Sequence, residues 1–141
     1  MAWKILKLRK FSDVSWIVRR ACVENLCQIS AISDKQTRET SLTNCILKML
    51  KDSNKWVKLS SYKALGPFIS SLNGMNISEK LFEAYSQMTT SSVNSLSADS
   101  NEVMSTCSFY FPGVLAAFGP EKWPAMRQMF NFLIKKPPEV F

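Results

Sequence analysis

The chain has 141 residues, of which 46% are hydrophobic, and it carries a net charge of +7 with a pI of about 9.4. Its length suits one folded unit, and its apolar content excludes a chain that is disordered as a whole. It contains no histidine, which excludes Ser-His-Asp and Cys-His catalysis and every histidine-dependent metal site.

Apolar residues recur along most of the chain with the three- and four-residue spacing of amphipathic helices. There are only four glycines, which disfavours a sheet-and-turn protein. The sequence therefore predicts an all-α protein, with helices at about residues 3–11, 14–32, 35–51, 55–72, 77–89, 102–118 and 121–135. The Ser/Thr-rich stretch 90–101 is longer than a usual helix–helix connection, and we expect a mobile loop there.

The sequence also repeats itself at an offset of 39 residues. That offset lies near the low end of the roughly 40–47-residue period of HEAT and armadillo arrays. The pattern predicts a HEAT-repeat α-solenoid of about three and a half helical hairpins, a fold that offers an extended surface to partners. The matched pairs are Asp13 and Asp52, Val18 and Val57, Arg19 and Lys58, Leu26 and Leu65, and Ile29 and Phe68.

Two prolines fall at similar places inside predicted apolar helices. Pro67 follows Val57 by 10 residues, and Pro112 follows Val103 by 9. Because a proline in a helix interior removes a backbone hydrogen bond and costs ~3 kcal/mol or more, its recurrence predicts a bend that the architecture uses.

An aspartate precedes a basic residue by six positions in both repeats, Asp13 before Arg19 and Asp52 before Lys58. In a stacked array these residues can form a ladder of ion pairs between neighbouring turns. The alternative is a helix cap plus an exposed charge, which contributes ~1 kcal/mol or less.

The four cysteines are scattered, with no Cys-x-x-Cys pair, and we interpret them as small buried side chains in a reducing compartment. Charges interrupt the first ten residues, unlike a signal peptide, and no apolar run approaches the roughly 18 residues that span a bilayer. We expect a cytoplasmic or nuclear protein without membrane contact, cofactor or enzymatic activity.

Several segments carry a family resemblance. Residues 12–26 and 52–69 resemble HEAT repeats of phosphatase scaffold subunits. The run Cys-Ser-Phe-Tyr-Phe-Pro-Gly-Val-Leu at 107–115, followed by Trp123-Pro124, resembles regulatory subunits of the 1 and 4 type of protein phosphatase 4. These subunits are relatives of the scaffold subunit of protein phosphatase 2A. The resemblance extends from Ser12 to Ile134, and because a full subunit of this family has many more repeats, it implies a fragment or a short isoform.

The resemblance implies a non-catalytic adaptor that binds a serine/threonine protein phosphatase catalytic subunit and directs its substrate choice. A substrate or a third subunit is a further expected partner. In such relatives the turns between paired helices form a ridge that grips the catalytic subunit. Trp16 and Trp56 differ by one residue in the repeat register, which leaves open that one of them belongs to the core. The matching ridge residues here are Asp13, Ser15, Trp16, Ser53, Asn54, Lys55 and Trp56.

The basic charge supports an alternative function, a helical-repeat adaptor for nucleic acid or an acidic protein cargo. The aromatic residues, however, follow core spacing and are not interleaved with the basic ones, as a single-strand platform requires. The sequence therefore disfavours nucleic acid as the partner. The basic residues in question are Lys4, Lys7, Arg9, Lys10, Arg19 and Arg20.

Overall fold

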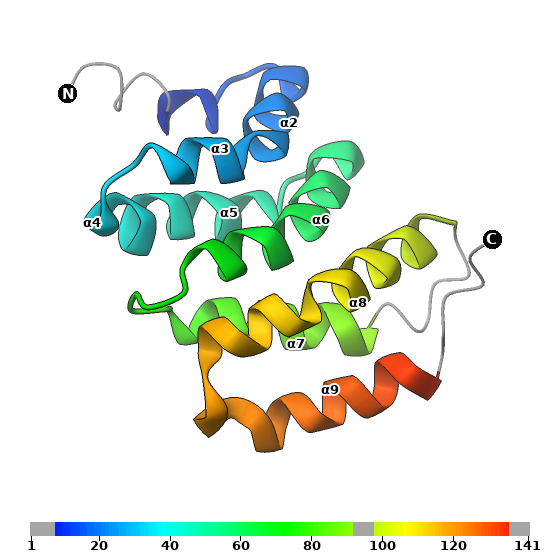
Figure 1. Ribbon diagram of the computed structural model, residues 1–141. Helices are drawn as coiled ribbons and strands as arrows, with labels where there is room; N and C mark the ends of the chain where they lie inside the picture. Colours follow the sequence, from blue (N-terminus) through cyan, green and yellow to red (C-terminus); the bar gives the residue numbers. More distant parts are fainter. Residues whose placement is uncertain (1–7, 92–97, 136–141) are drawn as a thin grey trace.

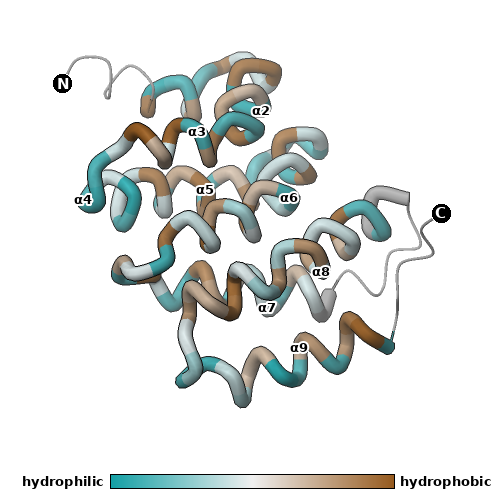
Figure 2. The backbone as a smooth tube through the Cα atoms, viewed as in Figure 1, coloured by the Kyte–Doolittle hydropathy of each residue, from teal (hydrophilic) through white to brown (hydrophobic). Residues whose placement is uncertain are grey.

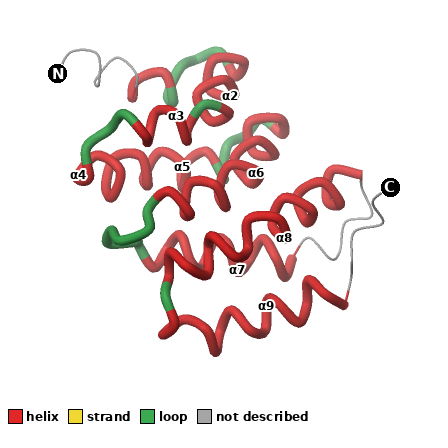
Figure 3. The backbone as a smooth tube through the Cα atoms, viewed as in Figure 1, coloured by secondary structure: helices red, strands yellow, loops and turns green. Residues whose placement is uncertain are grey.

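The computed structural model describes residues 8–91 and 98–135, and all regular structure within them is helical (Figures 1 and 3). Residues 8–10 are helical and precede the first turn. The elements are α2 (Trp16–Glu24), α3 (Leu26–Ala31), α4 (Lys35–Thr37), the π-helical turn η1 (Arg38–Leu42), α5 (Thr43–Met49), α6 (Lys55–Ser71), α7 (Glu79–Ser91), α8 (Ala98–Phe118), the 3-10 turn η3 (Pro120–Lys122) and α9 (Trp123–Lys135).

The helices form two layers, and α6 is the middle helix of one of them. In one layer α6 lies between α2 and α8, and in the other α7 lies between α5 and α9 (Figure 1). Helices α5 and α7 also pack against α6, and α9 packs against α8. Helices of the same layer therefore stack side by side, and the contacts of α6 with α5 and α7 and of α8 with α9 join the two layers.

One apolar core runs through both layers. Figure 2 shows hydrophobic and hydrophilic residues alternating along the helices, as expected when each helix buries one face. Tyr85 is fully buried, and its hydroxyl donates to the Cys107 carbonyl at 3.0 Å. The core includes Leu26, Leu42, Ile46, Leu65, Phe68, Leu81, Val114 and Met126.

Helices α6 and α8 approach closely at two glycines. A Cβ atom on Gly66 would lie 3.0 Å from the Tyr110 Cβ, and one on Gly113 would lie 2.5 Å from the Ser70 Oγ. Both glycines neighbour a proline, Pro67 and Pro112, and the helices run continuously through these positions. Because neither glycine has a Cβ atom, α6 and α8 can pack closely at these positions. The bends predicted at the two prolines remain a prediction.

The predicted helix 14–32 is two helices. The break falls at Asn25, whose side-chain Nδ2 donates to the Ala21 carbonyl at 2.7 Å. This bond competes for a helix carbonyl and distorts the turn, which apolar spacing alone does not reveal. The next predicted helix, 35–51, contains the turn η1, where the Thr43 hydroxyl donates to the Arg38 carbonyl.

The predicted loop 90–101 is too long. Helix α7 continues to Ser91 and α8 begins at Ala98, so only residues 92–97 are left between them, and these lie outside the described residues. Most of the predicted helix 3–11 lies outside them as well. Helix α6 ends one residue before the predicted end, and the positive φ of Gly74, 81°, is part of the turn that follows.

The cysteines are less uniformly buried than predicted. Only Cys107 is fully buried, and the other three are partly exposed. Burial raises the pKa of all four thiols, for Cys107 to about 12. In residues 8–91 and 98–135, no helix has both the length and the hydropathy to cross a membrane.

Candidate partner-binding ridge

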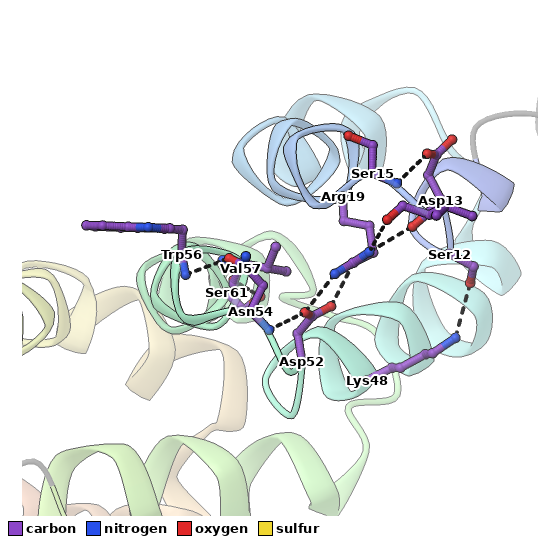
Figure 4. A network of polar contacts seen from close by, with 11 residues as sticks. Ser12, Asp13, Ser15, Arg19, Lys48, Asp52, Asn54, Trp56, Val57 and Ser61 are labelled. Atoms are coloured by element: carbon purple, nitrogen blue, oxygen red, sulfur yellow. Dashed lines mark hydrogen bonds and ion pairs between the residues drawn. The ribbon is translucent and has the colours of Figure 1, made fainter.

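The two turns predicted to contact a partner lie at the same edge of the molecule. One turn precedes α2 and the other precedes α6, and both helices begin on the right side of Figure 1. Figure 4 shows the two turns joined by polar contacts. We call residues 12–16 and 52–56 together the ridge.

The second turn of the ridge is fixed by local caps. The Asp52 Oδ1 accepts a hydrogen bond from the Asn54 backbone N–H at 2.8 Å. The Asn54 Oδ1 in turn accepts from the N–H groups of Trp56, at 2.9 Å, and Val57, at 3.2 Å. Asn54 is therefore the N-cap of α6, and the cap sets the direction in which Lys55 and Trp56 leave the turn.

The first turn has a similar but less complete arrangement. The Asp13 Oδ1 accepts a hydrogen bond from the Ser15 backbone N–H at 2.9 Å, and its Oδ2 lies 3.9 Å from the Lys10 Nζ. Ser15 holds the N-cap position of α2 without a side-chain hydrogen bond. Both turns thus use an aspartate to fix the backbone two residues later.

Arg19 joins the two turns (Figure 4). Its Nε and Nη2 donate to Asp52 Oδ2 and Oδ1 at 2.9 and 3.0 Å, a two-point ion pair. Its Nη1 donates to the carbonyls of Asp13 and Val14 at 2.9 and 3.1 Å. Arg19 therefore pairs with the aspartate of the neighbouring turn and touches only the backbone of its own. The side chain of Lys58, its counterpart in the second repeat, is exposed.

The Arg19–Asp52 pair is mostly buried, with the two side chains 16% and 7% exposed. Burial by itself raises the pKa of Asp52. Hydrogen bonds from Arg19 and the Asn54 N–H, together with the charges of Arg19 and Lys48, outweigh burial, so the pKa of Asp52 lies below its ordinary value. Asp52 is thus ionised at neutral pH and serves the junction between α2 and α6.

The two tryptophans of the ridge differ. Trp16 is partly buried against the core, whereas Trp56 is 46% exposed and points away from the polar network in Figure 4. The Lys55 Nζ lies 5.3 Å from the centre of the Trp56 ring. Asp13 and Asn54 accept hydrogen bonds within their own turns, so of the seven residues predicted to contact a partner, the exposed ones are Ser15, Ser53, Lys55 and Trp56.

Two contributors to this edge, Lys48 and Ile17, were not predicted. Lys48, at the end of α5, donates from Nζ to the Ser12 Oγ at 3.2 Å and so links a third segment to the first turn. Val14 and Ile17 are 98% and 62% exposed. The apolar spacing that predicts helix 14–32 does not distinguish Ile17 from the buried residues of that helix, so no sequence signal marks its exposure.

The ridge offers contact chemistry: hydroxyls, an ammonium group, an indole ring and exposed aliphatic side chains. Among the described residues no group of three or more Cys, Asp or Glu side chains is placed to hold a metal ion.

Comparison with curated proteins gave three similar sequences. The chain is 32% identical over 76 residues to human serine/threonine-protein phosphatase 4 regulatory subunit 1, an alignment that covers 54% of this chain and 8% of the human protein. The mouse and rat proteins of the same name are 32% identical over 72 residues, 51% of this chain and 8% of theirs. No family model and no solved structure matches.

The alignment is shorter than the range from Ser12 to Ile134 predicted for the resemblance, and the chain spans only about 8% of the length of these relatives. The relatives are nonetheless the ones that residues 12–26, 52–69 and 107–115 indicated. The resemblance to a regulatory subunit of protein phosphatase 4 is therefore confirmed over about half of the chain.

Proposed function

We propose that this chain is a non-catalytic HEAT-repeat α-solenoid that binds a serine/threonine protein phosphatase catalytic subunit at the ridge and directs its substrate choice. The similarity to regulatory subunit 1 of protein phosphatase 4 is the observation that carries the choice of partner. In this proposal the metal ions and the chemistry of dephosphorylation belong to the catalytic subunit.

The geometry supports the repeat part of the proposal. Helix α2 begins at Trp16 and α6 at Lys55, which reproduces the 39-residue offset of the sequence. The two helices stack side by side, and the Arg19–Asp52 pair connects their turns as an inter-repeat ladder requires. A stack of this kind leaves one edge of turns open to a partner.

Trp56 is the residue we propose as the centre of the contact. A half-exposed indole on a capped and therefore rigid turn can bury a large area against a partner at little cost in conformational entropy. Its exposure also means that the fold depends little on it. A contact role and a core role are therefore separable by experiment.

Affinity purification of the tagged chain from cells, followed by an immunoblot for phosphatase catalytic subunits and a phosphatase assay, tests the proposal. For Trp56→Ala we expect recovery of the catalytic subunit to fall at least about tenfold, since a central aromatic contact is typically worth 2 kcal/mol or more. Trp123→Ala is the matched control, because Trp123 is 39% exposed on α9, outside the ridge, and recovery should be unchanged.

Equal recovery with both variants would place the phosphatase contact elsewhere on the chain. If the folded wild-type chain recovers no catalytic subunit, the proposed function is wrong. Thermal unfolding of each variant shows whether the chain is folded and keeps that outcome distinct from loss of structure.

A further inference from the structure

Nearly all of the net positive charge lies in two segments that the fold brings together. Residues 8–20 and 48–58 hold eight basic and two acidic side chains, whereas the rest of the chain holds ten basic and nine acidic ones. These segments contain the ridge and the residues that flank it. We call their shared surface the basic edge.

Both carboxylates of the basic edge are engaged by groups within it. Asp52 is held by Arg19, and Asp13 accepts from the Ser15 N–H with Lys10 at 3.9 Å. Most of the basic side chains, in contrast, are exposed. The exposed basic residues of the edge are Arg9, Lys10, Lys48, Lys51, Lys55 and Lys58. The surface therefore presents positive charge with little negative charge among it.

An apolar site lies within this positive surface. The Trp56 ring is 46% exposed, and the Lys55 Nζ lies 5.3 Å from its centre. Val14, in the first turn of the ridge, is 98% exposed. Exposed apolar side chains among basic ones fit a ligand that carries several negative charges and at least one apolar side chain.

The form of the basic edge favours carboxylates of a protein over phosphates. The first N–H groups of α6 are occupied by the Asn54 cap, so the helix N-terminus offers no ready backbone site for a phosphate. The exposed charges on residues 48–58 are all lysines, without the guanidinium forks that bind phosphate in a two-point manner. One exposed indole also provides no series of rings on which bases could stack.

We propose that the basic edge binds an acidic segment of a protein partner, with carboxylates facing Lys51, Lys55 and Lys58 and an apolar side chain packed on Trp56. The inference rests on the proposed function in taking the partner to be a protein. It adds the chemistry by which that partner is recognised, and it implies association that is fast at low salt and weakens as salt is added.

Fluorescence anisotropy with the full chain tests this proposal. The probe is a short fluorescein-labelled peptide of glutamates with one central leucine, and the reference probe has glutamine in place of every glutamate. The wild-type chain should bind the acidic probe, lose it as salt rises and ignore the reference. The variant K51Q/K55Q/K58Q should bind about tenfold more weakly, as expected for three exposed charge pairs.

The control variant K80Q/R127Q/K135Q removes the same number of charges from exposed positions outside the basic edge. It should bind the acidic probe within about twofold of wild type. If both variants lose binding equally, the attraction is a property of net charge and the proposal is overturned. A single-stranded oligonucleotide that binds more tightly than the acidic probe would overturn it in favour of nucleic acid.

The same two variants in the phosphatase purification separate this inference from the proposed function. If K51Q/K55Q/K58Q still recovers the catalytic subunit as wild type does, the phosphatase function stands and the acidic-segment inference fails. If the wild-type chain binds the acidic probe at the basic edge but recovers no phosphatase, the inference stands for another protein and the proposed function fails.

Discussion

Helix α6 is joined to its two neighbours in the same layer by opposite means. Its junction with α2 includes a charged pair, Arg19 with Asp52, located at the edge of the molecule beside the ridge. Its junction with α8 depends on backbones that approach closely at Gly66 and Gly113, in the interior. The first junction is set by electrostatics and the second by shape, so the two should respond to different perturbations.

The largest effect is expected from filling the α6–α8 crossing. A Cβ on Gly66 would lie 3.0 Å from the Tyr110 Cβ, which is fixed to the α8 backbone, so Gly66→Val must push the helices apart. We expect the free energy of unfolding to fall by about 3 kcal/mol, the upper range for overpacking. Urea denaturation followed by circular dichroism measures this loss.

Ala116→Val is the control, because Ala116 is exposed on α8 and the added methyl groups meet solvent. Its cost should be only the helix propensity of valine, about 0.6 kcal/mol. Equal losses in the two variants would mean that α6 and α8 are not held by a close crossing.

A smaller effect is expected from removing the charge of Asp52. Asp52→Asn leaves the Arg19 guanidinium largely buried without its carboxylate, and we expect a loss of about 2 kcal/mol. The matched pair is Arg20–Glu24 on the same helix, with an equally short contact of 2.8 Å but side chains 42% and 49% exposed. For Glu24→Gln we expect at most about 0.5 kcal/mol. Similar losses would show that burial does not strengthen the α2–α6 junction.

The contribution of Asp52 to the free energy of unfolding should also depend on pH. The folded state lowers the pKa of Asp52, so its stabilisation is fully present above the unfolded pKa of about 3.9 and is lost as pH falls through the folded value. The difference in unfolding free energy between wild type and Asp52→Asn should therefore be constant from about pH 5 to pH 8 and shrink below about pH 4. A difference that grows on acidification would contradict the lowered pKa.

The sequence was most informative where a local rule decides structure. Helix α6 begins at Lys55, as the predicted helix 55–72 does, and the prediction for its end differs by one residue. The Asn25 break was missed because it depends on one side-chain hydrogen bond to Ala21. The start of α8 was missed because its first residues are polar and show no apolar period.

The ridge was harder to predict than the helices. Sequence spacing grouped Trp16 and Trp56 but could not tell that the first packs against the core and the second faces solvent, because a register difference of one residue is resolved only by packing. The sequence predicted bends at the two prolines. It did not predict the close approach at Gly66, beside Pro67, because that approach depends on a helix more than 30 residues away in the chain. The Arg19–Asp52 contact likewise needed the stacking of α2 on α6.

The smallest effects distinguish two adjacent serines on α6. The Ser70 Oγ is buried without a hydrogen-bond partner in the described part of the chain, and it faces Gly113 at the close crossing. Ser70→Ala removes this unsatisfied group and improves helix propensity, so we expect a gain of about 0.5–1 kcal/mol. Urea denaturation resolves a shift of this size against wild type.

Ser71→Ala should have the opposite sign. The Ser71 hydroxyl donates to the Phe68 carbonyl at 2.6 Å and lies 3.3 Å from the Oγ of the buried Ser30, which would lose its partner. We expect a loss of about 1 kcal/mol. Opposite signs at neighbouring positions would show that the α8 side of α6 is governed by steric fit, whereas its α2 and α3 side relies on polar pairing. A loss at both positions would mean that the Ser70 hydroxyl is satisfied after all, and that the two sides of α6 differ less than their contacts indicate.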